Sequence, residues 1–308
     1  MKKRGEYYIT QFFYLNLQTL IFIGKMKQFK FLMVAFSLLM GVSLTSCLNS
    51  ESDPNSYGGG MVKVQSYTGY TSFKGEGGIT ITPTLASISV LEANGLKISE
   101  LSDKVVNIAY RWDPTQVDIP KDSKDIKGVE LYSIESLDNP VEIVEEKGVS
   151  ANDSLAHSNN AAIISVGYDA SGMKYEPQFF YDDYTIVVPM NYYINNKKHF
   201  LSLMYYPNED NGPELTLYLA HNSNKDSESA NSTSWNLTAN TGGYYGLGLF
   251  YKAYDLRSVI SRYKRETGFF ENPPVVKIVA NVNQYSMKLD DSQTEEKTYT
   301  VTKKEADK

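Results

Sequence analysis

Two histidines flank a polar loop in a pattern typical of a β-hairpin. His199 has the phase of the leucines that follow it, and His221 has the phase of the leucines that precede it. If the two strands pair antiparallel around residues 207–213, residues whose numbers sum to about 420 lie opposite each other, so His199 faces His221. Two neighbouring imidazoles with a carboxylate from Asp182 or Asp183 form a ligand set suited to a divalent metal.

The alternative for both histidines is structural. At the end of an apolar face, each ring can donate a hydrogen bond to a backbone carbonyl at the rim of a sandwich. Because both histidines follow the phase of the leucines, we favour this interpretation, and no metal site is predicted. His157 lies in a polar linker, where we expect a solvated side chain.

No catalytic residue and no cofactor site are predicted. The chain has no Gly-x-Ser-x-Gly elbow, no Walker loop, no His-Glu-x-x-His and no Gly-x-Gly-x-x-Gly ahead of a helix. The segment Asn208-Glu209-Asp210-Asn211 offers oxygen ligands but lacks the spacing of an EF-hand loop, so we interpret it as a hairpin turn.

The only cysteine ends a segment with the proportions of a secretory signal. Lys27 and Lys30 precede an apolar run over residues 31–43 that is too short to span a membrane comfortably, and Leu44-Thr45-Ser46-Cys47 follows. This tetrapeptide resembles the lipobox of bacterial lipoproteins, in which the thiol receives a diacylglyceryl group, the chain is cut before the cysteine, and the new amino terminus is acylated. The resemblance implies lipidation of Cys47, and several acyl chains give a stable anchor. A plain secretory signal is the alternative.

Residues 1–25 contain a second, broken apolar stretch that fits no part of such a signal. We interpret them as an extension upstream of a true start at Met26, with an unusually long leader as the alternative; residues 26–46 are then the lipoprotein signal peptide. Those 46 residues hold six of the 30 bases and one of the 36 acids, so the mature chain carries 24 bases, 35 acids and a net charge of −11. Nucleic acid is therefore excluded as a partner, since it requires clustered Lys and Arg.

The mature chain divides into five segments. A flexible linker over residues 47–60 contains three consecutive glycines, and its acidic Ser50–Asp53 resembles the surface-export signals of Bacteroidetes lipoproteins, with an ordinary acidic linker as the alternative. We expect one domain over 61–146, a linker over 147–161, a second domain over 162–285, and a frayed charged tail over 286–308. Asp153-Ser154-Leu155 resembles a Bacteroidetes O-glycosylation site, which makes Ser154 a glycosylation candidate.

Both domains have the period-two alternation of strands, with Gly, Asp and Pro between the runs. In the first domain, for example, Val106, Ile108, Tyr110 and Trp112 form one face of a predicted strand, with Asn107 and Arg111 opposite. The pattern predicts an all-β protein: a small OB-like barrel, then an Ig-like antiparallel β-sandwich. One short helix of about two turns is predicted from the spacing of Leu256, Val259, Ile260 and Tyr263, with Asp255 as its cap.

Many aromatic residues lie in these strands. They offer stacking faces for sugars, but tyrosine is also a common strand residue, and we favour that simpler explanation. The residues are Tyr67, Tyr70, Tyr192, Tyr193, Tyr205, Tyr206, Tyr244, Tyr245 and Trp235.

The order of several stretches resembles the NigD-like lipoproteins of Bacteroidetes. That family has a lipobox, an N-terminal OB-type domain and a C-terminal β-sandwich, and the resemblance implies the same fold here without a known molecular activity. The turn Ser102-Asp103-Lys104 departs from the family's usual Asp-Gly-Gln-Arg type. The matching stretches are Met61–Thr82, Leu101–Trp112, Lys198–Leu203, Glu214–Asn222 and Tyr254–Leu256 before the strand at Val275.

Together these features predict a non-catalytic lipoprotein, palmitoylated and anchored in the outer membrane, exposed at the cell surface, and serving as a binding or interaction module for a glycan or an envelope protein. One alternative is a glycan-system accessory or hydrolase-like protein that uses Asp182, Asp183 and His199. A second alternative is a fimbria-like structural subunit that associates through an edge strand.

Overall fold

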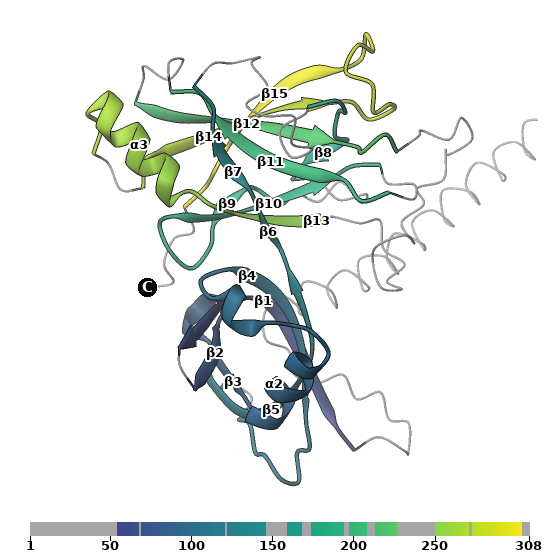
Figure 1. The fold of residues 1–308 in the computed structure, drawn as a ribbon, viewed down its shortest axis with the longest axis vertical. Coiled ribbons are helices and arrows are strands. Elements are labelled where there is room, and N and C mark those ends of the chain that lie inside the picture. The colour runs from purple at the N-terminus through teal and green to yellow at the C-terminus, as the bar shows by residue number, and fades with distance from the viewer. Residues whose placement is uncertain are drawn as a thin grey trace, which may run out of the picture.

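The computed structural model describes residues 54–67, 69–120, 122–145, 159–167, 174–193, 197–207, 213–226, 250–270 and 273–303. They form a barrel and a sandwich arranged end to end (Figure 1). Within these ranges no helix has the length and apolarity needed to cross a bilayer. Cys47, His157 and Ser154 lie outside the described residues, as do the predicted turn at 208–211 and the aromatic residues Trp235, Tyr244 and Tyr245.

The N-terminal unit is a closed barrel of five strands in the order β1-β2-β3-β5-β4. The alternating apolar residues of β4 point inward and are buried, as the sequence predicts. The predicted OB-like barrel is therefore confirmed. Its elements are β1 (Ser56–Tyr67), β2 (Tyr70–Lys74), η1 (Glu76–Gly78), β3 (Thr80–Pro83), α2 (Leu85–Ala93), η2 (Ile98–Leu101), β4 (Val105–Trp112) and β5 (Asp125–Ser136).

The helix α2 is absent from the sequence prediction. The side chain of Thr84 caps it by accepting a hydrogen bond from the amide of Ser87, and Ile88 packs into the barrel core. The segment escaped prediction because its apolar residues surround the whole helix and show no helical period. Its outward face is consequently apolar too, with Leu85 70% and Val90 60% exposed.

The three consecutive glycines belong to β1, which begins at Ser56. The predicted end of the flexible linker at residue 60 is therefore wrong, because the strand starts before it. Gly58 lies opposite Tyr110 in the neighbouring strand β4. A Cβ on Gly58 would lie only 2.6 Å from the Tyr110 ring, and one on Gly59 only 2.6 Å from the Ile108 carbonyl oxygen. Glycine is required here because an aromatic side chain and a backbone carbonyl occupy the space of a side chain.

Gly58→Ala is therefore expected to lower the free energy of unfolding by about 1–2 kcal/mol, because the Tyr110 ring must leave its place in the core. Gly75→Ala is the control, since its added Cβ would meet Ile79 at 3.5 Å, an ordinary contact. Urea unfolding of both variants makes the comparison. Equal stability of the two variants would mean that the glycines do not hold this part of β1 in place.

The C-terminal unit is a sandwich of two sheets, as predicted, but the sheets are mixed. Strand β12 runs parallel to β14, β11 to β7, and β13 to β6. Parallel neighbours need a long crossover, which the chain from β12 through β13 and α3 supplies. One sheet is β6 (Asp138–Asn139), β13 (Phe250–Asp255), β10 (Thr185–Asn191) and β8 (Ser165–Val166), with β9 (Gln178–Phe179) also on β10. The other is β15 (Glu295–Thr300), β14 (Val275–Val282), β12 (Glu214–Asn222), β11 (Phe200–Tyr205) and β7 (Val141–Ile143).

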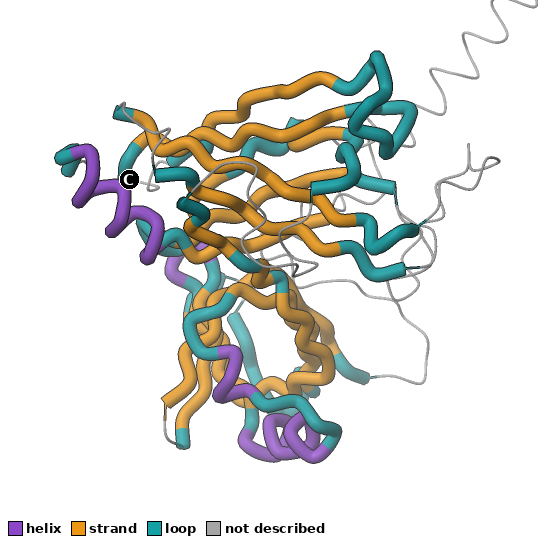
Figure 2. The backbone as a smooth tube through the Cα atoms, turned by 45° about the horizontal axis from the view of Figure 1, so that its top comes forward, coloured by secondary structure: helices purple, strands orange, loops and turns teal. Residues whose placement is uncertain are grey.

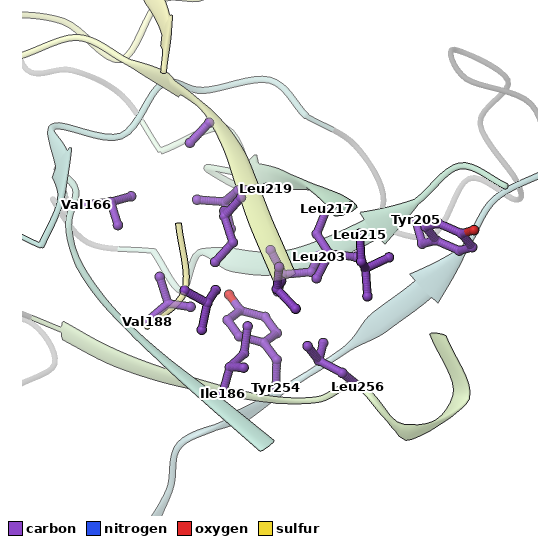
Figure 3. Packing of buried hydrophobic residues seen from close by; sticks show 14 of the residues in the cluster. Val166, Ile186, Val188, Leu203, Tyr205, Leu215, Leu217, Leu219, Tyr254 and Leu256 are labelled. Carbon is purple, nitrogen blue, oxygen red and sulfur yellow. The ribbon is translucent and has the colours of Figure 1, made fainter. Parts of the chain in front are cut away.

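Alternate side chains of the two sheets fill the space between them (Figure 3). Leu215, Leu217 and Leu219 from one sheet meet Ile186 and Val188 from the other, and all are buried.

The helix predicted from the spacing of Leu256, Val259, Ile260 and Tyr263 is also present. The helix α3 (Arg257–Thr267) buries Val259, Ile260 and Tyr263 against this core and ends at Gly268, whose φ of 72° suits a left-handed cap. Its N-cap residue is Leu256, while the Asp255 carboxylate accepts a hydrogen bond from the Arg257 amide.

Besides the start of β1, the domain boundaries differ from the prediction at two further places. Residues 138–143 form β6 and β7, which pair with sandwich strands, so the barrel ends with β5 at Ser136. The predicted frayed tail from residue 286 is wrong, because Glu295–Thr300 forms β15 along β14 and Val301 is buried. A charged strand of this kind fits at a sheet edge, where its outward side chains remain solvated.

Candidate functional site

The two histidines lie together in the second sheet, although the register differs from the predicted one. Leu201, and not His199, lies opposite His221. His199 precedes Leu201 by two residues and therefore lies on the same face. The Nδ1 atom of His199 lies 2.8 Å from Nε2 of His221, so the predicted neighbours make a direct hydrogen bond.

Hydrogen bonds extend this pair in both directions. His221 Nδ1 lies 3.2 Å from the Ala162 carbonyl oxygen, and His199 Nε2 lies 3.1 Å from Asp226 Oδ2. A carbonyl only accepts, so His221 Nδ1 donates to it and Nε2 is an acceptor, which receives the proton of His199 Nδ1. The last contact then needs one further proton, carried by His199 or by the Asp226 carboxyl. If all three contacts are hydrogen bonds, the linked groups Ala162, His221, His199 and Asp226 hold one proton more than two neutral rings and a carboxylate.

The hydrogen-bonded side chains of His221, His199 and Asp226 are buried and cannot be reached by a substrate. The side chains of His199 and Asp226 have no exposed surface, and His221 is 1% exposed. Burial, and then the neighbouring His199, lower the pKa of His221 to about 3. The pKa of His199 is also lowered, by burial first, against the opposing effect of Asp226. These directions indicate a cross-link within the sandwich and not a base available to a substrate.

Aromatic side chains cover the pair on the side of the first sheet. The Tyr192 ring stacks on His199 with centroids 5.6 Å apart, meets His221 edge-on at 5.3 Å, and contacts Phe250 at 4.7 Å. Lys252 Nζ lies 6.0 Å from the centre of the Tyr192 ring, close enough for a cation–π contact. The cluster therefore ties β12 and the residues that flank β11 to β13 of the opposite sheet.

The carboxylates proposed as metal partners lie elsewhere. Asp182 pairs with Lys63 of the barrel, and Asp183 Oδ1 lies 3.2 Å from Lys303 Nζ. In the described part of the chain, no group of three or more His, Cys, Asp or Glu side chains is arranged to hold a metal ion. The two histidine nitrogens that face each other are also occupied by their mutual hydrogen bond.

Lys63 forms a second buried polar cluster, between the domains. Its ammonium group is a partner of the Asp182 carboxylate and lies 2.9 Å from Thr185 Oγ1, and its side chain is only 4% exposed. Asp182 also accepts hydrogen bonds from the amides of Tyr184 and Thr185 at 3.0 and 2.7 Å. Burial raises the pKa of Asp182, but the bonds from Lys63 and the Tyr184 amide outweigh it and leave that pKa lowered.

An apolar contact surrounds this ion pair. Val187 of the sandwich packs with Val105 of the barrel, and Phe180 and Ala253 complete the cluster. Strand β10 is buried on both faces because one face lines the sandwich core and the other meets the barrel. Backbone bonds run from the Leu137 amide to the Val105 carbonyl oxygen, and from the Ala253 amide to the Leu137 carbonyl oxygen. The two domains therefore form one continuous body.

The predicted tyrosines do not share one surface. Tyr192 and Tyr205 are buried in the sandwich, whereas Tyr67 and Tyr70 face each other at the exposed turn between β1 and β2. Tyr193 donates to the Gln284 carbonyl oxygen, and Tyr206 packs edge-on against Tyr218. Ordinary strand usage accounts for the buried members of the set.

Sequence reasoning missed Asp226 and Lys63. Asp226 follows β12 in a polar segment with the composition of a turn, and only the fold brings it to His199. Lys63 lies between Val62 and Val64, and this alternation indicates that its side chain points out of the barrel. The side chain does point outward, but it is buried because the sandwich covers that side of β1.

Neither a family model nor a curated protein matches the chain. Among solved structures, a candidate lipoprotein from Bacteroides fragilis is similar, with 24% identity, a TM-score of 0.56, and coverage of 80% of this chain and 97% of that protein. The chain has the fold of this Bacteroides protein. An uncharacterised protein from Parabacteroides merdae (12% identity, TM-score 0.44, coverage 79% and 96%) and a NigD-like immunity protein from Bacteroides caccae (13%, 0.41, 79% and 96%) also match.

Proposed function

We propose that this chain is a NigD-like, non-catalytic envelope lipoprotein that presents a rigid two-domain β body as a binding module. The observation that carries the proposal is the buried contact between the domains, centred on Lys63 and Asp182, which fixes their relative orientation. A fixed pair of domains presents a preformed surface, and preformed surfaces lose little entropy on binding. The lipobox at Cys47 and the fold shared with a candidate Bacteroides lipoprotein support the envelope location.

A hydrolase-like activity has less support from the geometry. It would need Asp182, Asp183 and His199 in one site, but each has a different partner: Lys63, Lys303 and the His221–Asp226 chain.

We propose an outer-membrane location with surface exposure, and a glycan or an envelope protein as the partner. Glycan arrays and envelope pull-downs with the purified mature chain test the binding role, and reproducible turnover of any glycan would refute it.

Replacing Cys47 by alanine tests the anchor. We expect the variant chain to lose incorporation of labelled palmitate and to keep its leader, because one thiol carries the lipid and its loss also blocks cleavage at that position. Ser46→Ala, which retains the cysteine and a small residue before it, is the control and should still be cleaved and incorporate palmitate. Equal palmitate incorporation by the two variants would contradict lipidation of Cys47. Protease treatment of intact cells then reports whether the anchored body faces outward.

A further inference from the structure

The sandwich covers one side of the barrel and leaves the rest of the barrel wall open (Figures 1 and 2). On β1 the outward residues Met61 and Lys63 both meet the sandwich. The next outward residues of this strand are Gln65 and Tyr67, and Tyr67 is 69% exposed. The outer wall of β1 therefore continues from the contact between the domains into solvent.

A tyrosine of the sandwich reaches this wall. Tyr181 lies in the turn between β9 and β10, and its φ of 68° is uncommon for a residue with a large side chain. The next residue, Asp182, holds the turn against the barrel through Lys63. The Tyr181 hydroxyl oxygen lies 3.5 Å from Gln65 Nε2, and the residue is 46% exposed. The turn thus places an exposed tyrosine beside the outward residues of β1.

The strand β2 adds a third exposed tyrosine, next to two enclosed hydroxyl groups. Tyr70 pairs with Tyr67 and Ser72 with Gln65, so all four point to the same side of the barrel wall. Continuing the register of β2 with β3 places Thr82 opposite Ser72. The nearby hydroxyl groups of Thr82 and Ser72 lower the pKa of Tyr70. Yet in the described part of the chain both hydroxyl oxygens are buried and make no hydrogen bond of ordinary geometry, which calls for a partner.

The chemistry of this wall matches a neutral sugar. The tyrosine rings suit the apolar C–H faces of a sugar, and the Gln65 amide suits its hydroxyl groups. A sugar hydroxyl both donates and accepts, so it can satisfy Ser72 and Thr82 as well. The flanking cations Lys63 and Lys74 already contact Asp182 and Thr80, and the mature chain is strongly acidic. An acidic polymer would therefore be repelled.

We infer that this surface, the tyrosine wall, binds a neutral oligosaccharide. The rings of Tyr67 and Tyr181 stack on sugar faces on either side of the Gln65 amide. A shift of the half-exposed Tyr70 side chain opens the two enclosed hydroxyl groups to the ligand. The inference names the partner of the proposed binding module and rests on that function. The tyrosine wall consists of Gln65, Tyr67, Tyr70, Ser72, Thr82 and Tyr181.

The test presents the purified mature chain to an array of neutral, uronic-acid and sulfated oligosaccharides, and then measures the affinity for the neutral glycans bound. We expect Tyr67→Ala and Tyr181→Ala each to weaken binding about tenfold, because each removes one stacked ring. Tyr132→Ala is the matched control and should bind like the unsubstituted chain. Tyr132 is also on the barrel and 50% exposed, but it lies against Tyr57 near the start of β1, whereas Tyr67 ends that strand.

Ser72→Ala separates a ligand-binding role from a structural one. The substitution removes a buried hydroxyl group that has no partner, so urea unfolding should show no loss of stability. Binding should nevertheless weaken by roughly threefold to tenfold, the effect of one hydrogen bond to the ligand. Unchanged binding by this variant would exclude a ligand contact at Ser72.

Three outcomes would overturn the inference. Equal glycan affinity of Tyr67→Ala, Tyr181→Ala and the unsubstituted chain would place the glycan elsewhere and leave the binding function intact. Binding of acidic glycans alone would exclude a neutral ligand. Capture of an envelope protein that is lost in Tyr67→Ala, with no glycan bound, would assign the wall to a protein. A chain that binds neither glycan nor envelope protein would instead refute the proposed function itself. Tyr67→Ala, at an exposed turn, carries the test if Tyr181→Ala fails to fold.

Discussion

Asp182→Asn lowers the free energy of unfolding by roughly 2–3 kcal/mol, because it leaves the ammonium group of Lys63 between the domains without its counter-charge. Asparagine keeps the side-chain oxygen that accepts from the Tyr184 and Thr185 amides, so the turn itself is preserved. The expected loss is below that of a fully enclosed pair, since the Asp182 side chain remains 29% exposed. Urea unfolding followed by tryptophan fluorescence and circular dichroism measures the change.

A second substitution makes this prediction specific to the ion pair. Lys63→Met removes the charge that Asp182→Asn leaves uncompensated, so the double variant should be more stable than Asp182→Asn alone. The exposed pair Arg111–Glu130 is the control, and Glu130→Gln should cause no measurable change. If Lys63→Met failed to rescue Asp182→Asn, the cost would have to arise in the turn and not in the charge.

Acid should destabilise the protein through His221, in the range between about pH 6.5 and pH 3. The pKa of this histidine falls to about 3 in the folded state, chiefly because the ring is buried. In the unfolded chain its pKa returns to about 6.5, so below that pH the unfolded state binds a proton that the folded state refuses. The stabilising contribution is complete above pH 6.5 and decreases by about 1.4 kcal/mol per pH unit below it.

His221→Phe removes this titration while keeping an aromatic ring beside Tyr192. We expect the variant to lose about 2–4 kcal/mol at pH 7, because His199 Nδ1 and the Ala162 carbonyl oxygen lose their partner. Its stability should then decrease less steeply than that of the unsubstituted chain, by about 2 kcal/mol between pH 6.5 and pH 5. Denaturant unfolding across that range measures both slopes, and parallel slopes would contradict the assignment.

Asp226→Asn separates the hydrogen bond from the extra proton. The Asn side-chain NH₂ group can donate to His199 Nε2, which completes the chain with neutral groups only. We expect this variant to stay within about 1 kcal/mol of the unsubstituted protein at pH 7. Asp226→Leu offers no donor and should cost more, so equal effects of the two substitutions would count against the proposed arrangement of protons.

The alternation of apolar and polar residues along the sequence was enough to predict much of the fold. Alternation along β4 predicted the inward residues from Val106 to Trp112, and the leucine phase placed His199 and His221 on one face of one sheet. Local alternation determines which side chains share a face, and a shift of register by two residues leaves that face unchanged. For this reason the histidines meet although Leu201 takes the position opposite His221.

The sequence by itself determined the strand class, the faces of the strands, the helix α3 and the lipobox-like end of the leader. Only the tertiary structure decided that Asp226 and not Asp182 completes the histidine chain, that Lys63 is buried, and that β15 joins the sandwich. Each of these depends on segments distant along the chain, whose contact leaves no local period in the sequence. A lysine between two valines has the pattern of a solvated side chain until a second domain covers the outer face of its strand.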